Sequence, residues 1–533
     1  MLKYYRNVAY VLVLLIVSVC TAAQSHDESA ACDQSGRITF TANPIFDLTD
    51  NDSIFLHRWA NFLHVDTKVA TLKNEAAFFI NKCEVNAADL AELERHLRNT
   101  RYIRDAKVEF DKDKHISVNT WDNWSLMPTL SAGRKGGKNK FEFGFQERNL
   151  LGLGINAKLE YFTDSQRSGY KLDTTFPLSM GNNTEANFRL VDSDDGEYYG
   201  AFLQKKFVSF DTPYAFKIGA SESTFNDTIF QNGKDKSTFT HQTKFATAEG
   251  GWLYQDNQNS TLRFNVGLTQ DSHYFEYLDA KHSIDEPIIP LDRDFLYPFI
   301  GIDYQQKDYR KLQNIHLINH IEDFNFGWQF TGKLGTSINS SQNAASLIWQ
   351  AEVNKGFSLS PESLLLMQLQ VEGEQYDTRP NRLLSSLTSE FFYRFNPQWA
   401  FHFKNTNVIS SHQYIEDPVS LGGDTGLRGY PVQYQHGDKS ILFNTEIRYY
   451  PHINIYKVLE LGAVGFIDTG KAWDAINSGN VENKWLNSVG IGARLYSSHS
   501  SEAKVIHIDL AAPLSNSDSV NTYEFRVTTN YSF

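Results

Sequence analysis

Past its N-terminal segment, the chain lacks any long apolar run. Its mean hydropathy is -0.42, and no later apolar stretch reaches the roughly 18 residues that a membrane-spanning helix requires. These absences exclude a helical membrane protein. They do not exclude a membrane β-barrel, because barrel strands alternate lipid-facing and lumen-facing side chains and are polar on average.

Cysteine is scarce, and positive charge does not predominate. The sequence holds 3 cysteines, and its formal net charge is -13. The acidic balance argues against nucleic acid as a partner. Cys20 falls within the first 23 residues, directly after the N-terminal apolar run. Cys32 and Cys83 are a candidate disulfide, and two unpaired buried thiols are the alternative.

Motifs of enzyme active sites are also missing. The glycine-rich residues 423–429 could be misread as a nucleotide-binding fingerprint, but that fingerprint needs a strand before it and a helix after it, and only strands and turns follow here. Residues 133–138 lack the leading glycine of a phosphate-binding loop, and Asn139 stands where Ser or Thr belongs. No metalloprotease motif or nucleophile elbow occurs. The sequence therefore predicts no enzyme, no catalytic residue, no cofactor and no metal site.

Residues 1–23 have the order of a secretory signal peptide. Lys3 and Arg6 supply positive charge, residues 8–19 are apolar, and residues 21–23 are small enough for cleavage. We therefore expect export, with cleavage at the end of this segment. An uncleaved membrane anchor is the alternative.

Residues 37–123 have the pattern of a small α/β domain. The expected elements are a strand at 37–40, a helix opening at residue 53, a helix at 87–98, and strands at 103–110 and 115–120. Asn86 is expected to cap the second helix. The connection over residues 64–83 has no assigned structure.

From Met127 to the C-terminus the pattern changes to strands and turns. Runs of about ten residues alternate apolar with polar side chains, and turns rich in Asn, Asp, Gly or Ser separate them. Clear examples are residues 262–269, 324–330 and 399–404. A soluble sandwich would not need roughly 400 such residues without a helix. Residues 127–533 are therefore predicted to form a transmembrane antiparallel β-barrel, and the chain is mainly β.

The chain ends in an amphipathic strand over residues 523–533. Its apolar side chains alternate with polar ones and finish with Tyr531 and Phe533. A last strand with a terminal aromatic resembles the sorting signal of bacterial outer-membrane barrels. The alternative is an ordinary exposed strand of a soluble sandwich.

The most specific motif is LGGDTGLRGYP, at residues 421–431. It resembles the inserted-loop motif of the BamA/TamA superfamily of outer-membrane assembly and secretion barrels. In that superfamily the loop, here residues 410–440 and called the motif loop, folds back into the barrel lumen. The motif residues are Gly426, Arg428, Gly429 and Tyr430.

The resemblance implies acidic partners for Arg428. Residues 465–470 resemble the superfamily's Phe-x-Asp-x-Gly strand, whose aspartate pairs with the loop arginine, and this implies Asp468. In the strand at 441–450 the apolar residues share one face, so Glu446 points into the lumen as a second acidic neighbour. The alternative is that these groups only line a solvated pore.

The same resemblance implies a single POTRA-like periplasmic domain at 37–123 and a barrel of about 16 strands. The residue pattern itself allows eleven to fifteen strands before the motif loop and five after it, so eighteen or twenty strands also fit. Residues 149–154 (NLLGLG) resemble the turn after an early strand of these barrels.

Three functions follow as expectations from the resemblance. The first is a barrel that assists insertion of outer-membrane proteins, receiving clients at the POTRA-like domain and releasing them through a lateral seam between strands 127–134 and 523–533. The second is a two-partner-secretion-type transporter for one dedicated polypeptide, and the third is a passive porin-like barrel. The implied partners are outer-membrane lipids, unfolded outer-membrane or secreted polypeptide clients, and periplasmic chaperones. The implied place is the bacterial outer membrane, with the N-terminal domain in the periplasm.

Overall fold

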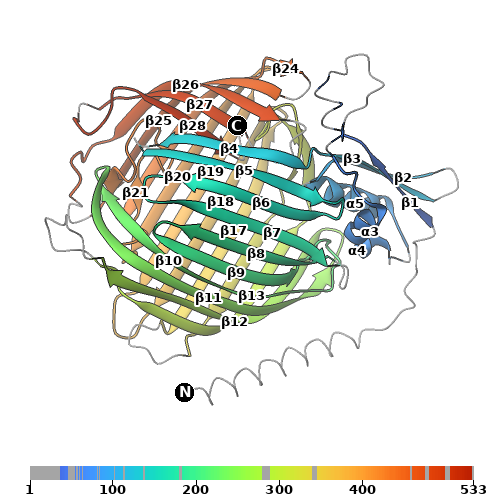
Figure 1. The fold of residues 1–533 in the computed structure, drawn as a ribbon, viewed down its shortest axis with the longest axis horizontal. Coiled ribbons are helices and arrows are strands. Elements are labelled where there is room, and N and C mark those ends of the chain that lie inside the picture. Colours follow the sequence, from blue (N-terminus) through green and yellow to red (C-terminus); the bar gives the residue numbers. More distant parts are fainter. Residues whose placement is uncertain are drawn as a thin grey trace.

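A small α/β domain sits at one end of a large β-barrel in this computed structural model (Figure 1). The structure describes residues 37–530 except 46–54, 56–57, 59–60, 63, 81, 83, 101, 112–114, 136–137, 179–182, 279–288, 339–344, 457–458, 475–478, 498–504 and 516. The expected signal peptide at 1–23, the candidate disulfide partners Cys32 and Cys83, and the terminal aromatics Tyr531 and Phe533 lie outside the described residues.

The α/β domain has a three-stranded sheet in the order β1-β3-β2. β1 (Ile38–Asn43) runs parallel to β3 (Ile116–Asp122), and β2 (Ile103–Phe110) runs antiparallel to it. The connection at residues 64–83, which had no sequence assignment, contains α3 (Val69–Glu75) and α4 (Ala77–Ile80).

The longest helix of the described residues is α5 (Ala87–Asn99). Its cap is the one expected: the Asn86 side chain accepts from the backbone N–H groups of Ala88 and Asp89, and the Asp89 side chain accepts from the Asn86 backbone N–H. One face of α5 is apolar and packs on the sheet through Leu90, Leu93 and Leu97. The opposite face of α5 is charged and contacts the barrel, through Glu92 and Arg98 among others.

The barrel is a closed ring of antiparallel strands. Its strands are β4 (Leu126–Lys135), β5 (Lys138–Leu150), β6 (Ile155–Thr163), β7 (Ser168–Leu178), β8 (Thr184–Ser193), β9 (Gly196–Lys205), β10 (Tyr214–Gln231), β11 (Lys234–Asp256), β12 (Ser260–Tyr277), β13 (Arg293–Gln306), β16 (Gln329–Gly335), β17 (Leu347–Ser360), β18 (Ser363–Gln375), β19 (Arg382–Arg394), β20 (Trp399–Ser411), β23 (Lys439–Tyr449), β24 (Asn454–Ile455), β25 (Leu459–Trp473), β26 (Leu486–Ser497), β27 (Val505–Pro513) and β28 (Glu524–Asn530). The ring closes where β28 meets β4, a contact we call the seam.

The expected number of about 16 strands is wrong. Over the described residues the ring contains twenty-one segments. The two-residue β24 only continues the line of β23 along β25, so twenty strands cross the wall. Fifteen of them precede the motif loop and five follow it, which is the upper limit of the count from the residue pattern. The error came from adopting the strand number of the resembling superfamily.

The barrel wall is polar inside and apolar outside. On β23 and β25, Glu446 and Asp468 face the lumen and are buried, whereas Ile447 and Ile467 face outward and are exposed. This alternation is the pattern of a barrel whose outer face meets lipid and whose inner face is polar. Among the described residues, none of the helices combines the length and apolar character needed to traverse a bilayer.

Strand length varies strongly around the ring. β10, β11 and β12 have 18, 23 and 18 residues. By contrast, β27 has 9 residues, and the two strands of the seam, β28 and β4, have 7 and 10. The wall is therefore tallest at β10, β11 and β12, and its strands are shorter around the rest of the ring, the described part of the seam included.

The two ends of the barrel differ in what covers them. The turns after β5 and β9 contact the α/β domain, and this side is called the domain end. Because successive strands are antiparallel, the motif loop after β20 lies at the opposite, far end. An inserted hairpin at residues 307–328, here called the plug hairpin, lies at the domain end between β13 and β16. It contains β14 (Tyr309–Gln313) and β15 (Ile321–Asn325).

Candidate functional site

The motif loop folds inward from the far end of the barrel. Of the expected residues 410–440, the loop itself comprises 412–438, because β20 ends at Ser411 and β23 begins at Lys439. At its base, β21 (Ser420–Leu421) pairs with β22 (Gln435–His436). Its apolar side chains pack against lumen-facing wall residues in one buried cluster of Leu421, Leu427, Tyr430, Tyr434, Leu442, Ala472 and Leu486. This packing fixes the loop against the inner surface of β23, β25 and β26.

The loop also reaches across the far mouth of the barrel. The Phe230 backbone N–H at the end of β10 donates to the Gln433 side chain at 3.1 Å. At the neighbouring Gly233, an added Cβ would lie only 2.4 Å from Pro431. The turn between β10 and β11 therefore touches the loop from the opposite wall.

Arg428 is the centre of a buried ion cluster. Its Nε and Nη2 atoms donate to the two carboxylate oxygens of Asp468, each at 2.7 Å, and its Nη1 donates to Glu446 at 2.9 Å. All three side chains are buried. The guanidinium also lies 3.5 Å from the ring centroid of Phe466. The bidentate pair with Asp468 fixes the orientation of the guanidinium as well as balancing its charge. The cluster brings together Arg428, Asp468 and Glu446, the three residues that the motif resemblance implied.

The cluster continues toward the domain end. The Arg448 Nε atom donates to the second carboxylate oxygen of Glu446 at 3.0 Å, and Arg448 Nη2 lies 2.8 Å from Nδ1 of His402. Arginine can only donate, so this histidine nitrogen must accept. The Nη1 atom of Arg448 then donates to the backbone carbonyl of Ile315 at 3.0 Å. Ile315 belongs to the plug hairpin, so a single chain of hydrogen bonds joins the motif loop to that hairpin.

The loop holds the last strand of the barrel as well. The Gly429 backbone N–H donates to Glu524 at 2.9 Å, and Arg526 Nη1 donates to the Gly423 carbonyl at 2.9 Å. Glu524 and Arg526 lie on β28, at the seam. Sequence reasoning placed Glu524 and Arg526 on the polar face of the last strand but gave them no role. The feature that could have indicated their role is the pair of charges on the lumen-facing side of the last strand, in a barrel whose motif loop carries an arginine.

Gly429 occupies a backbone conformation that most residues avoid. Its φ is +91°, and an added Cβ would lie 3.0 Å from Cδ of Pro513. We predict that Gly429→Ala destabilises the folded barrel by about 1–3 kcal/mol through backbone strain and crowding. The measurement is the temperature at which the compact band of the folded barrel on an unheated gel converts to the unfolded band.

Gly465→Ala is the matched control. Gly465 lies in β25, and an added Cβ there meets nothing within 4 Å. Its unfolding temperature should stay close to that of the wild type, because surface substitutions usually change stability by less than about 0.5 kcal/mol. Equal unfolding temperatures for the two variants would contradict the role assigned to Gly429.

A second buried cluster joins the α/β domain to the barrel. Asp122, at the end of β3, accepts from the Thr67 backbone N–H at 2.8 Å and from the Thr67 hydroxyl at 2.9 Å, and lies 2.8 Å from Nε2 of His64. Asp122 is fully buried. The Asn149 side chain of β5 donates to the same Thr67 hydroxyl at 2.8 Å. The Asp122 carboxylate therefore positions His64 and Thr67 of the α/β domain, and Thr67 in turn contacts Asn149 of the barrel wall.

The turn after β5 completes this junction. The Gly152 carbonyl accepts from the Lys68 backbone N–H at 3.0 Å and from the Thr71 hydroxyl at 2.7 Å. This turn belongs to the NLLGLG segment, which sequence analysis matched to these barrels without assigning it a role. Its structural role is to receive the α/β domain.

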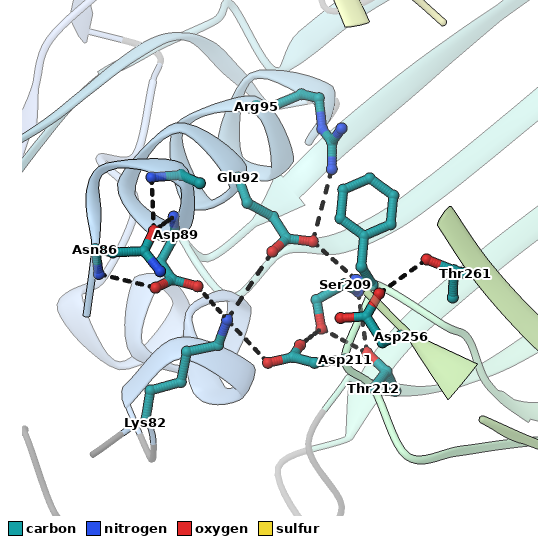
Figure 2. Close-up of polar contacts among 12 residues, drawn as sticks. Lys82, Asn86, Asp89, Glu92, Arg95, Ser209, Asp211, Thr212, Asp256 and Thr261 are labelled. Carbon is teal, nitrogen blue, oxygen red and sulfur yellow. Dashed lines mark hydrogen bonds and ion pairs between the residues drawn. The ribbon is translucent and has the colours of Figure 1, made fainter. Parts of the chain in front are cut away.

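The charged face of α5 docks on the turn between β9 and β10 (Figure 2). Glu92 accepts from the Phe210 backbone N–H at 2.8 Å, and Lys82 lies 2.7 Å from Asp89 and 2.8 Å from Asp211. Burial raises the pKa of Glu92, and the bond from Phe210 opposes that rise. Burial lowers the pKa of Lys82, but its hydrogen bonds to Asp211 and Asp89 outweigh burial and raise it. Lys82 thus bridges the domain and the barrel as a cation.

The described residues contain one group with metal-ligand spacing. The ligand atoms of His64, Asp66 and Asp122 lie within 4.8 Å of one another. Both oxygens of Asp122 already accept hydrogen bonds from Thr67, and one also contacts His64. The geometry is accounted for by its structural role at the junction.

Comparisons with known proteins give matches only among solved structures. No protein-family model matches the sequence, and no curated protein gives a significant match. The structure of BamA from Haemophilus ducreyi lacking POTRA domains 1-3 shares 11% identity, covering 87% of this chain and 82% of that chain, with a TM-score of 0.40. CdiB from Escherichia coli shares 12% identity, covering 92% and 76%, with a TM-score of 0.44. CdiB from Acinetobacter baumannii shares 11% identity, covering 88% and 73%, also with a TM-score of 0.44. The chain is similar to BamA and CdiB to this extent, and its function must be argued from its own geometry.

Proposed function

We propose that this chain is an outer-membrane β-barrel of the BamA/TamA kind that assists insertion of other outer-membrane proteins. The observation that carries the proposal is the pair of bonds from the motif loop to the seam strand, Gly429 to Glu524 and Arg526 to Gly423. A loop that is hydrogen-bonded to β28 can control whether β28 stays paired with β4 at the seam. The role is mechanical and requires no catalytic residue.

The arrangement of the ends supports a periplasmic α/β domain. The first barrel strand, β4, follows directly from the domain, and β28 ends on the same side, because twenty antiparallel strands return the chain to its starting side. An exported chain with the expected signal peptide would place this side in the periplasm. The motif loop would then face the cell exterior.

The domain offers sheet edges for a client. In the order β1-β3-β2, the outer strands β1 and β2 each pair on one side within the described sheet. An extended client segment can add to such an edge through backbone hydrogen bonds. The seam between β28 and β4, whose strand β28 is bonded to the motif loop, would provide the exit.

Secretion of one dedicated polypeptide is the second candidate. It is favoured by the polar inner wall, where Glu446, Arg448 and Asp468 face the lumen. A permanently open porin-like channel is disfavoured, because the motif loop packs inside the far end and the plug hairpin occupies the domain end. Lumen passage by a polypeptide would require both to move.

Quantitative proteomics of the outer-membrane and secreted fractions of a deletion strain separates these functions. Depletion of several barrel proteins from the membrane, restored by the wild-type gene, is the expected result. Loss of a single secreted polypeptide with an unchanged membrane fraction would replace assembly by secretion. Two unchanged fractions would overturn both.

A further inference from the structure

The plug hairpin crosses the lumen at the domain end. It is rooted between β13 and β16, but Leu317 and Ile318 at its tip are buried against the opposite wall. The wall residues of this cluster are Ala400, Tyr450, Val464, Phe466, Tyr496, Val505 and Ala511. These residues lie on or beside β20, β23, β25, β26 and β27, so the hairpin reaches the wall that carries the motif-loop cluster.

A few polar contacts pin the tip to that wall. Arg448 donates to the Ile315 carbonyl at 3.0 Å, and Asn319 donates to Glu460 at 2.8 Å. Within the hairpin, Glu322 accepts from the backbone N–H of Ile315, His316 and Leu317 and so gives the tip its own shape. The tip therefore has a conformation held by its own hydrogen bonds, and it packs on the barrel wall without being one of its strands.

Helix α5 covers the hairpin from outside the barrel. Arg98 lies 3.2 Å from Asp323, and Lys311 lies 3.3 Å from Glu94. We call these two ion pairs the α5 latch. The Arg95 guanidinium also lies 4.1 Å from the ring centroid of Tyr309. The hairpin is thus held between the lumen wall on one side and the α/β domain on the other.

We propose that the plug hairpin is a removable gate that closes the lumen at the domain end, with α5 as its latch. A two-stranded hairpin is marginally stable by itself, so its position depends on the surfaces that hold it. Partly exposed ion pairs such as the latch contribute little each, which allows a movement of the α/β domain to release the hairpin. This proposal does not depend on whether the barrel inserts outer-membrane proteins or secretes one polypeptide, because the hairpin closes the lumen in either case.

The first test is ion conductance of the full chain in planar lipid bilayers. In the gate variant, residues 309–325 are replaced by Asn-Gly, which joins Asp308 to Phe326 through a tight turn. These two residues are already paired, because the Phe326 N–H donates to the Asp308 carbonyl at 2.8 Å. We expect a several-fold rise in steady conductance over the wild type. Unchanged conductance of the folded variant would overturn the gate.

The second test keeps the hairpin intact and reports its release. Ile318→Cys is introduced in a background in which Cys20, Cys32 and Cys83 are replaced by serine. Ile318 is 0% exposed, so a membrane-impermeant thiol reagent should react slowly in reconstituted vesicles. This variant also decides the question if the gate variant does not fold. Fast labelling with the latch intact would show that the tip is not seated and would overturn the gate.

The latch is tested by Lys311→Ala with Asp323→Ala in the same labelling experiment. Loss of two ion pairs should speed labelling about tenfold, through a larger open population. The matched control is Lys107→Ala with Glu109→Ala, an exposed ion pair on β2, which should leave the rate unchanged. Equal rates for the latch and control variants would show that α5 does not hold the gate.

Discussion

Arg428→Ala is expected to destabilise the folded barrel by about 3–5 kcal/mol. Asp468 and Glu446 would both stay buried without the cation that they share. The motif loop would lose its strongest anchor, and its grip on the seam strand through Gly429 would weaken with it. The measurement is the midpoint of urea unfolding in lipid vesicles, followed by the gel mobility of the folded barrel.

Two variants show whether burial and geometry carry this effect. Arg428→Lys keeps the charge but loses the bidentate fork, so its midpoint should fall between those of the wild type and Arg428→Ala. Arg189→Ala removes a half-exposed arginine of β8 that pairs with Asp173 at 3.1 Å, and it should cost less than about 1 kcal/mol. If Arg428→Ala and Arg189→Ala shift the midpoint equally, the buried cluster does not anchor the loop.

Asp122→Ala is expected to release the α/β domain from the barrel, at a cost of about 3 kcal/mol. The Thr67 N–H, the Thr67 hydroxyl and His64 would lose the carboxylate that they share in a buried site. The barrel wall itself should survive, because Asp122 lies outside it. Limited proteolysis should therefore cut near residues 64–68 while the barrel keeps its folded gel mobility.

Asp111→Ala provides the comparison for this junction. Asp111 sits in the exposed turn after β2, where it accepts from the His115 backbone N–H at 2.8 Å. Its removal should change stability by about 0.5 kcal/mol or less and leave residues 64–68 protected. Protection of residues 64–68 in the Asp122 variant as well would exclude the junction as the tie between the two parts.

The features that were predictable from sequence have a local signal. Strict alternation along residues 441–450 assigned Glu446 to the lumen, and side-chain spacing assigned the Asn86 cap and the helix after it. The motif resemblance pointed to Arg428 and Asp468, which the fold brings within 2.7 Å. Each of these depends on a few residues close in sequence or on one specific motif.

The features that sequence analysis missed depend on long-range contacts. Residues 324–330 alternate regularly and were assigned to one wall strand, yet β15 ends at Asn325 in the plug hairpin and the wall resumes at Gln329. Alternation cannot distinguish a strand of the wall from a strand inside it, because both bury one face. Likewise, Asp122 and Thr67 are 55 positions apart, and nothing local to either residue indicates their contact.

The chain of bonds from Arg428 through Glu446 and Arg448 to the Ile315 carbonyl has a thermodynamic consequence. It makes the two ends of the lumen energetically linked rather than independent. Linkage is reciprocal: whatever free energy the seated hairpin lends to the loop, the seated loop lends to the hairpin. A ligand that bound only the undocked motif loop at the far end of the barrel would therefore also favour release of the hairpin. Conversely, a movement of the α/β domain that released the hairpin would weaken the docking of the motif loop at the far end of the barrel.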